Sequence, residues 1–540
     1  MSPKPRNSDQ HNGAAVDDAA ATPPDEYPEN LDAGLLKIAG VCVLAAVMAI
    51  LDTTVVSVAQ RTFIKDFATT QAIVGWTMTG YTLALATVIP LTGWAADRFG
   101  TKRLFLCSVF FFSLGSLLCA MAPNITLLVA FRVVQGLGGG MLMPLTFTIL
   151  TREAGPRRLG RLMAVLGIPM LLGPIGGPIL GGWLIDYGWR WIFLINLPIG
   201  ALAFTLAAVI FPKDRSSPGE SFDFVGMLLL SPGLATFLYG VSSIPGRGTA
   251  ADPHVYIPVA IGLTLILGFI FHALYRADHP LIDLRLFKNK VLALANATMF
   301  LFAIAFFGAG LLFPSYFQQL LHQSPFQSGL HMVPQGLGAM STMPLAGRYM
   351  DKRGPGKVVL VGITLIATGM GIFAYGVSQQ FHYTPVLLIG LAVMGMGMGC
   401  TMMPVSGSAV QALAPQQVAR GSTLINVNQQ VAGSIGTALM SVIVTSQFNK
   451  SEYVGTFNKA MAVQEEAARK SVPPDPSKLP PQFFAPGFMQ HVADDLTHAY
   501  AVVFVVAVCL VVATLLPASF LPKKPTSAAK GQPAAPVLAH

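Results

Sequence analysis

Charged residues are scarce in this sequence. Only 11% of its 540 residues are Asp, Glu, Lys or Arg and 53% are hydrophobic, whereas about a quarter of a soluble domain is charged. Apolar stretches of membrane-spanning length recur between Leu35 and Leu521, and each can cross a bilayer core as a helix. No short alternating strands are visible, which argues against a transmembrane barrel. Because a helix satisfies its own backbone polar groups in lipid, we expect an all-α polytopic membrane protein.

The chain also lacks the usual signatures of catalysis and of metal binding. Its five cysteines fall inside apolar runs without metal-ligand spacing, so we interpret them as small buried hydrophobes. His272 and His331 are isolated, and an intramembrane enzyme would need paired carboxylates or a nucleophile beside a base. No nucleotide-binding loop is present, since the alternating glycines near Gly397 have no strand-turn-helix context. We therefore expect no cofactor and no metal, and an ion gradient as the energy source.

Fourteen membrane spans are predicted from the apolar runs. They cover residues 35–59, 74–95, 103–122, 126–150, 161–185, 190–211, 224–243, 255–275, 291–317, 327–347, 357–377, 384–411, 421–446 and 498–521.

The net charge of +9 is explained by membrane topology better than by nucleic-acid binding. With the amino terminus in the cytoplasm, 24 Lys and Arg residues fall on the cytoplasmic side and 9 outside, and Arg132 lies within a span. Positive charge favours the cytoplasmic side. We therefore place the protein in the cell (inner) membrane, with both termini cytoplasmic.

Domain boundaries follow from these spans. Residues 1–34 are polar, as expected for a disordered cytoplasmic tail, and too polar for a cleaved signal peptide. We expect a six-helix bundle over 35–211, a linker with two inserted spans over 212–290, a second six-helix bundle over 291–521 and a cytoplasmic tail over 522–540. The loop 447–497 faces outward as a flexible linker or a small cap, of which we favour the linker.

The two bundles are related by a weak internal repeat. Gly93, Asp97, Arg98 and Gly100 after span 2 return as Gly347, Asp351, Lys352 and Gly354 after span 10, 254 residues later. The Gly173-Pro174-Ile175-Gly176 run of span 5 corresponds to Gly433-Ser434-Ile435-Gly436 of span 13, 260 residues later. Spans 1–6 therefore match spans 9–14. Parallel repeats suit a transporter whose halves rock about a central site, whereas a receptor or structural role leaves the repeat unexplained.

Several motifs at these positions resemble those of the major facilitator superfamily, and most closely its fourteen-span drug:proton antiporters, the EmrB/QacA-like multidrug efflux transporters. They are Leu51-Asp52-Thr53-Thr54-Val55-Val56, the run from Gly93 to Arg103, Arg132-Val133-Val134-Gln135-Gly136-Leu137-Gly138, Gly167 with Gly173-Pro174-Ile175-Gly176-Gly177-Pro178, and the run from Trp189 to Pro198.

The resemblance implies roles for two groups of these residues. A conformational gate would lie on the cytoplasmic face, with charged residues pairing with helix ends; its residues are Gly93, Asp97, Arg98, Gly100, Lys102, Arg103, Asp351 and Arg353. A bendable antiporter helix would seal against span 9 of the other half; its residues are Gly167, Gly173, Pro174, Gly176, Gly177 and Pro178.

Asp52 and Arg132 are the only acid and base deep within the spans. Each is costly there, by about 2.5–3.5 kcal/mol on insertion scales. Both lie roughly 10 Å below the outer surface, counted at about 1.5 Å per helical residue. Similar depth allows an interaction, direct or through water, and predicts a site of proton coupling. A purely structural buried pair is the alternative.

Polar residues on the spans are candidates for lining a substrate cavity, or alternatively for bonding neighbouring helices. They are Tyr81, Gln135, Gly136, Asn426, Gln429 and Gln430. Five methionines crowd span 12, namely Met394, Met396, Met398, Met402 and Met403. They indicate either an adaptable surface for varied apolar ligands or ordinary helix packing.

The sequence thus predicts proton-driven export of small amphipathic compounds by alternating access. Uptake or facilitated transport of a specific metabolite or lipid is the alternative. Spans 9–14 contain no Asp or Glu, so the expected cargo is neutral, zwitterionic or monocationic. Besides the cargo we expect the lipid bilayer as partner, and the resemblance is compatible with an accessory envelope protein without requiring one.

Overall fold

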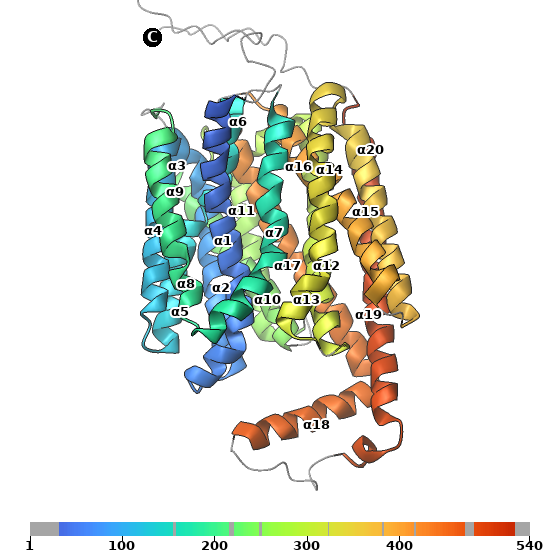
Figure 1. The fold of residues 1–540 in the computed structure, drawn as a ribbon. Coiled ribbons are helices and arrows are strands. Elements are labelled where there is room, and N and C mark those ends of the chain that lie inside the picture. The colour runs from blue at the N-terminus through green and yellow to red at the C-terminus, as the bar shows by residue number, and fades with distance from the viewer. Residues whose placement is uncertain are drawn as a thin grey trace, which may run out of the picture.

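A computed structural model describes residues 32–154, 158–214, 221–247, 251–321, 323–380, 383–414, 417–469 and 480–523. Helices form the elements of this described part, and it contains no strand. They run side by side in one bundle, while α18 lies across one end of it (Figure 1). The prediction of an all-α polytopic membrane fold is confirmed.

The first half extends from α1 to α9. Its helices are α1 Ala33–Asp66, α2 Gln71–Val88, η1 Ile89–Leu91, α3 Thr92–Phe99, α4 Thr101–Ala120, α5 Ile125–Gly139, α6 Leu142–Ala154, α7 Leu159–Asp186, α8 Trp191–Leu194 and α9 Asn196–Ile210.

The inserted segment and the second half follow. Their helices are α10 Phe224–Arg247, α11 Pro253–Tyr275, η2 Leu284–Lys288, α12 Lys290–Gln319, α13 Pro325–His331, α14 Val333–Arg353, α15 Pro355–Ser378, η3 Tyr383–Leu387, α16 Leu388–Gln411, α17 Val418–Lys450, α18 Glu452–Arg469, η6 Pro481–Phe484, α19 Phe488–Ala513 and α20 Leu515–Ser519.

Twelve helical stretches of the described chain are long and apolar enough to cross a membrane. The two other predicted spans, 161–185 and 327–347, coincide with α7 and with α13 and α14. Helix α14 carries four charged residues in its last turns, from Arg348 to Arg353. Helix α1 begins and α20 ends at the same end of the bundle, opposite α18 (Figure 1).

The internal repeat is visible in how glycines bring helices together. A Cβ on Gly136 of α5 would press on the backbone carbonyl of Tyr81 in α2, and one on Gly395 of α16 would press on the carbonyl of Gln335 in α14. Likewise Gly115 of α4 packs on the backbone of Gln135, and Gly369 of α15 on that of Met394. Thus α2, α4 and α5 are arranged as α14, α15 and α16. Tyr81, Gln135 and Ser116 then correspond to Gln335, Met394 and Met370.

The loops that follow α3 and α14 also repeat each other. Gly100 and Gly354 have φ angles of 90° and 85°. Side chains rarely adopt this conformation, so glycine is required for the turn into the next helix. Asp214 then caps the start of α4 through the backbone N–H groups of Lys102 and Arg103, at 2.7 and 3.2 Å.

Helix α10 lies against α2 of the first half and α17 of the second. Towards α2 it has specific contacts: the Ser231 hydroxyl donates to the carbonyl oxygen of Thr87 at 2.8 Å, and the ring of Tyr239 stacks on that of Trp76. Towards α17 the described contacts are apolar, with Leu238 in one cluster with Ala438. Helix α10, the first of the two inserted spans, therefore sits at the junction of the two halves, and α11 packs on α10.

Two sequence predictions need correction. The favoured flexible linker over 447–497 is wrong for residues 452–469, which form α18, and α17 and α19 extend into the same segment. The cysteines are not all buried, because Cys107 and Cys509 are exposed on the outer faces of their helices. The predicted tails fall largely on residues 1–31 and 524–540, outside the described part of the chain.

Candidate functional site

Asp52 and Arg132 meet inside the first half. Asp52 lies on α1 and Arg132 on α5, and the Nη1 atom of Arg132 is 2.5 Å from the Oδ2 atom of Asp52. Both side chains are completely buried. The interaction predicted from their similar depth is therefore present, and it is direct.

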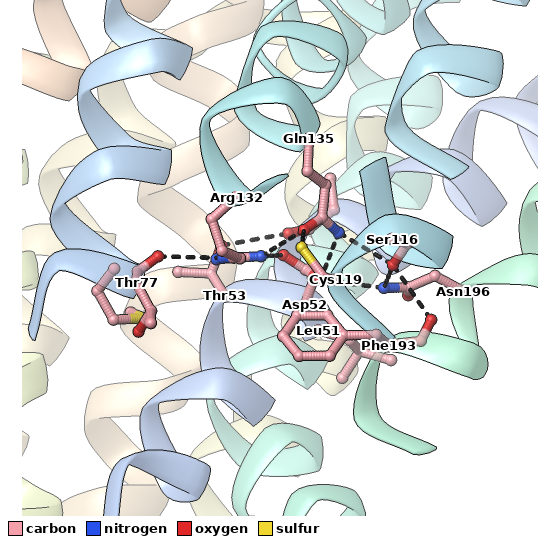
Figure 2. A network of polar contacts seen from close by, with 12 residues as sticks. Leu51, Asp52, Thr53, Thr77, Ser116, Cys119, Arg132, Gln135, Phe193 and Asn196 are labelled. Atoms are coloured by element: carbon pink, nitrogen blue, oxygen red, sulfur yellow. Dashed lines mark hydrogen bonds and ion pairs between the residues drawn. The ribbon is translucent and has the colours of Figure 1, made fainter. Parts of the chain in front are cut away.

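Three further side chains complete the surroundings of the carboxylate (Figure 2). The amide groups of Gln135 and Asn196 donate to Oδ1 of Asp52 at 2.8 and 3.0 Å. The Ser116 hydroxyl accepts from both amides, at 3.1 and 2.9 Å. Asp52 thus receives one charged and two neutral donors, supplied by α5 and α9 and supported by α4.

The guanidinium of Arg132 is held from several sides. Its Nε donates to the carbonyl oxygen of Thr77 at 3.1 Å, and Nη1 also donates to Oε1 of Gln135 at 2.7 Å. The ring of Tyr81 lies over it, with the central carbon 4.1 Å from the ring centre. Nη2 has no hydrogen-bond partner among the described residues. The charge is thus positioned, but one of its donor atoms remains unused.

This arrangement makes protonation of Asp52 consequential. A buried carboxylate and guanidinium compensate each other, whereas an unpaired buried charge costs about 3–5 kcal/mol. A proton on Asp52 would leave Arg132 without its counter-charge. The guanidinium would then need another acceptor or access to water, which would favour a different arrangement of α1 and α5.

Asn196 and Ser116 were not predicted as site residues. Asn196 is part of the Trp189–Pro198 motif, in which no role was predicted for it, and it is the amide in a span that is apolar on either side of it. Ser116 lies between apolar residues on α4. A polar side chain inside an apolar span is the signal that would have found both.

Two of the predicted cavity-lining residues contact Arg132 in this network, and a third packs on the neighbouring helix. Tyr81 and Gln135 are buried against Arg132, and Gly136 packs on the backbone of α2. On α17, Asn426 donates to the carbonyl oxygen of its own helix residue Ser422. Gln429 is buried and its Nε2 has no partner among the described residues. 

Gln430 lies where α2, η1, α10 and α17 meet, together with Ala86, Ile89, Leu234 and Leu238, and no space for a water molecule is left between them.

At the end of the bundle where α1 begins and α20 ends, the gate residues of the first half contact both halves (Figure 1). A Cβ on Gly93 of α3 would lie 3.1 Å from the Thr423 hydroxyl and 3.2 Å from the backbone of Arg420, so α3 packs closely on α17. Asp97 forms an ion pair with Arg152 at the end of α6, at 2.7 Å. The predicted pairing of this loop with helix ends is present for Asp97.

The other charged residues of this loop have different partners. The ammonium of Lys102 donates to the carbonyl oxygen of Phe211 at 2.9 Å, and Arg103 approaches Asp214 at 3.7 Å. No hydrogen bond or ion pair joins Arg98 to another described residue.

The corresponding residues of the second half form a clamp between the halves. Asp351, beyond the predicted end of span 10, accepts from the backbone N–H of Gly160 at 2.8 Å and from Nε of Arg161 at 3.3 Å, both on α7. Gly347 and Gly160 face each other, so that a Cβ on either would press on the carbonyl oxygen of the other. Burial raises the pKa of Asp351 to about 6, while its donors oppose the shift. The guanidinium of Arg353 lies 5.6 Å from the ring of Tyr349.

The glycines of α7 have two different partners. Gly173 packs on Ile50 and Gly177 on Thr54, both on α1 of the same half; Gly176 is also nearest α1, at Leu51. Gly167 packs on the methionine side chains of Met343 and Met403 in the second half.

In the second half, α7 packs mainly against α13, α14 and α16, in place of the seal expected with span 9, which is α12. The reason for the difference is geometric: the glycines of α7 let α1 approach from one side while α14 approaches from the other. Pro178 lies within α7 beside these glycines, and the side chain of Pro174 lies outside the described residues.

Comparison with known proteins agrees with this architecture. The family profile described as Major Facilitator Superfamily matches residues 42–437. A Mycobacterium tuberculosis protein named "Multidrug resistance protein B homolog" is 66% identical over 93% of this chain and 92% of its own length. The Escherichia coli "Multidrug export protein EmrB" is 29% identical over 75% of this chain and 79% of its own length.

Solved structures share the fold at low sequence identity. The proton:xylose symporter XylE, as a double-tryptophan mutant, superposes with a TM-score of 0.58 at 15% identity, covering 91% of this chain and 97% of its own. The human organic anion transporter MFSD10 gives a TM-score of 0.57 at 15% identity, covering 88% and 99%.

Proposed function

The chain belongs to the major facilitator superfamily, and from this premise we propose that it is a multidrug efflux transporter that exchanges protons for small amphipathic compounds. The observation that carries the proposal is the Asp52–Arg132 pair. Asp52 is the only fully buried acid among the described residues, and its carboxylate already has a charged partner inside the first half. A single acid in a dry bundle is a natural site for one exchangeable proton.

Coupling follows from the cost of leaving either charge alone. With Asp52 ionised, the pair is neutral and the packing around it is satisfied. Protonation from the outside weakens the pair, releases Arg132 and favours the arrangement that opens towards the cytoplasm. Loss of the proton to the cytoplasm restores the pair. Cargo moves outward in the half-cycle between these states, as in alternating access between two halves.

The close helix contacts made at glycines, at the end that we place in the cytoplasm, support this cycle. There α3 packs on α17, and α14 packs on α7. Both contacts must separate for cargo to enter from the cytoplasm. Individual exposed ion pairs contribute little, so closure depends on the backbone contact between Gly160 and Gly347 as well as on Asp351.

The direction and the cargo are proposed from the relatives and from charge. Relatives named for multidrug resistance and multidrug export favour export over uptake of one metabolite. With one acid available, a dication would keep an uncompensated charge in a poorly solvated site, which is expensive. We therefore expect neutral, zwitterionic or monocationic cargo, and a location in the inner membrane with both termini cytoplasmic. An accessory envelope protein is not required by any described feature.

The test uses inverted membrane vesicles and a matched set of neutral, monocationic and dicationic dyes. A pH gradient that is acidic inside the vesicles should drive accumulation of the neutral and monocationic dyes, and collapsing this gradient should stop the accumulation. Accumulation that ignores the gradient would contradict proton coupling, and preference for the dications would contradict the charge argument. Gradient-driven loss of dye from the vesicles would indicate uptake as the physiological direction.

A further inference from the structure

The second half contains a cavity at the position that corresponds to the Asp52 network. It is lined by residues of α12, α14, α15, α16 and α19, which lie together in the second half (Figure 1). Its wall includes Phe302, Phe306, Gln335, Met370, Met394 and Met398. By the repeat described above, Gln335, Met370 and Met394 stand where Tyr81, Ser116 and Gln135 stand in the first half.

The side chains at this position are polar in the first half and mainly apolar in the second. Three polar side chains in the first half correspond to one amide and two thioethers in the second. Aromatic rings and thioethers together make a surface that adapts to flat apolar groups. Nothing in the wall carries a charge, so the site has no means of binding a proton.

Gln335 has the one polar side chain among the residues that line this cavity. It is 7% exposed, and its Nε2 contacts the sulfur of Met398 at 3.1 Å. Its Oε1 has no hydrogen-bond partner among the described residues. A buried amide oxygen without a partner costs about 1–3 kcal/mol, so this atom favours a ligand that donates a hydrogen bond.

The free volume is about 20 Å³, enough for one water molecule. A larger ligand must displace the three methionine side chains. Unbranched thioethers repack with little strain, and an entering hydroxyl group would replace the hydrogen bond of a displaced water.

We propose that this cavity is a cargo subsite for a neutral aromatic group bearing one hydrogen-bond donor, with the donor placed on Oε1 of Gln335. The proposal rests on the proposed export function for its biological meaning, but binding itself requires no transport. One half then holds the proton and the other, at the corresponding place, holds the apolar part of the cargo.

The test compares 2-naphthol with 2-methoxynaphthalene, which has nearly the same shape but no donor. The full chain is purified into lipid nanodiscs, and binding is followed by naphthalene fluorescence without a pH gradient, with protein-free discs subtracted. The wild-type chain should prefer 2-naphthol by about fivefold, the value of one neutral hydrogen bond. Gln335→Met, which keeps the volume and removes the amide, should abolish that preference and retain 2-methoxynaphthalene binding.

A second pair of variants tests the location. Gly310 lines the cavity, and a Cβ there would meet nothing within 4 Å, so Gly310→Val should fold and weaken both probes about tenfold by filling space. Gly371 also has open space at its Cβ but does not line the cavity, so Gly371→Val is the matched control and should bind as wild type.

Equal binding of the two probes by wild type, a preference that survives Gln335→Met, or undiminished binding by Gly310→Val would each overturn the subsite. Vesicle transport is measured separately. Absence of gradient-driven export with intact, Gln335-dependent binding would remove the proposed function and leave the subsite standing.

Discussion

The two halves share one helix arrangement and differ in what they enclose. In the first half, the space between α1, α4, α5 and α9 is filled by Asp52, Arg132, Gln135 and Asn196, joined by hydrogen bonds at every step. In the second half, the corresponding space is apolar and incompletely filled. Polar networks need fixed geometry, whereas apolar walls tolerate variation. The comparison teaches that a repeat can keep its backbone contacts while its two copies take on separate chemistry.

The largest effect should follow from removing the charge that distinguishes the first half. Asp52→Asn is expected to abolish gradient-driven dye accumulation, because no other acid among the described residues is fully buried inside a membrane span. It should also lower thermal stability, since Arg132 loses its counter-charge at a cost of about 3–5 kcal/mol. Vesicle transport and thermal unfolding of the purified protein measure the two effects.

The charge-balanced double variant Asp52→Asn/Arg132→Gln is the control for this experiment. It should regain much of the stability while export stays absent. Gradient-driven export by well-expressed Asp52→Asn protein would refute the assignment of the proton to Asp52.

A reciprocal exchange between the halves sharpens the comparison directly. Gln135→Met places the second-half residue in the first half and removes one donor to Asp52 and one acceptor for Arg132. We expect at least a tenfold loss of transport and a stability loss of about 2 kcal/mol, the cost of buried polar atoms left unpaired.

Met394→Gln, the reverse exchange, should leave proton coupling intact and alter mainly the apparent affinity for dyes. The two variants are compared by measuring dye accumulation against dye concentration and against the pH gradient. If both changed coupling equally, the proposed division of roles between the halves would fail.

A smaller effect is expected from the contacts that join the halves at the end of the bundle that we propose to be cytoplasmic. In Gly347→Val, the Cβ would lie 2.6 Å from the carbonyl oxygen of Gly160, where the two atoms overlap. A Cβ on Gly93 meets its nearest neighbour only at 3.1 Å. Gly347→Val should therefore hold α14 away from α7 and slow turnover severalfold, with a weaker effect from Gly93→Val.

Spin labels at the exposed positions Phe99 and Lys352, in a background without native cysteines, report the separation by pulsed electron resonance. A larger population of long distances in Gly347→Val than in Gly93→Val is the expected result. The reverse order would show that the α3–α17 contact limits closure.

The smallest effect concerns pH at the same clamp. Burial raises the pKa of Asp351 to about 6 from an ordinary value of 3.8, so the closed clamp binds a proton more readily than the open one. The stabilisation of the closed clamp by protonation of Asp351 is fully present below pH 3.8 and is lost as the pH rises through about 6. The same spin-label distances, measured between pH 5 and 7, should shift towards the open clamp as pH rises.

Asp351→Asn should make these distances independent of pH over that range, while wild-type Asp52 remains in place as the transport acid. A pH response that persists in Asp351→Asn would assign the titration to a different group.

The sequence predicted those features that depend on spacing along one helix, and missed those that depend on contacts between helices. The helix-by-helix architecture, the repeat and the depth of Asp52 and Arg132 follow from hydropathy and residue counts. Ser116 and Asn196 complete the site only through the rotation of α4 and α9, which apolar runs do not determine. For the same reason Tyr81 and Gln135 were assigned to a cavity, although they face Arg132.

Two other differences have their own physical causes. Helix α18 is too polar to be recognised as a span, and nothing in its hydropathy separates it from a linker. The partner of α7 depends on which of its neighbours approaches the glycines, and small residues permit approach from more than one side. Sequence periodicity shows that a helix can pack closely without showing on which neighbour.

The position of α10 finally has a consequence for how the halves move. Its hydrogen bond and ring stack to α2 fix it to the first half, whereas its apolar side chains meet α17 without a directional partner. Apolar surfaces can slide because no specific bond has to break. We therefore expect α10 to move together with the first half, while α17 of the second half slides along its apolar face.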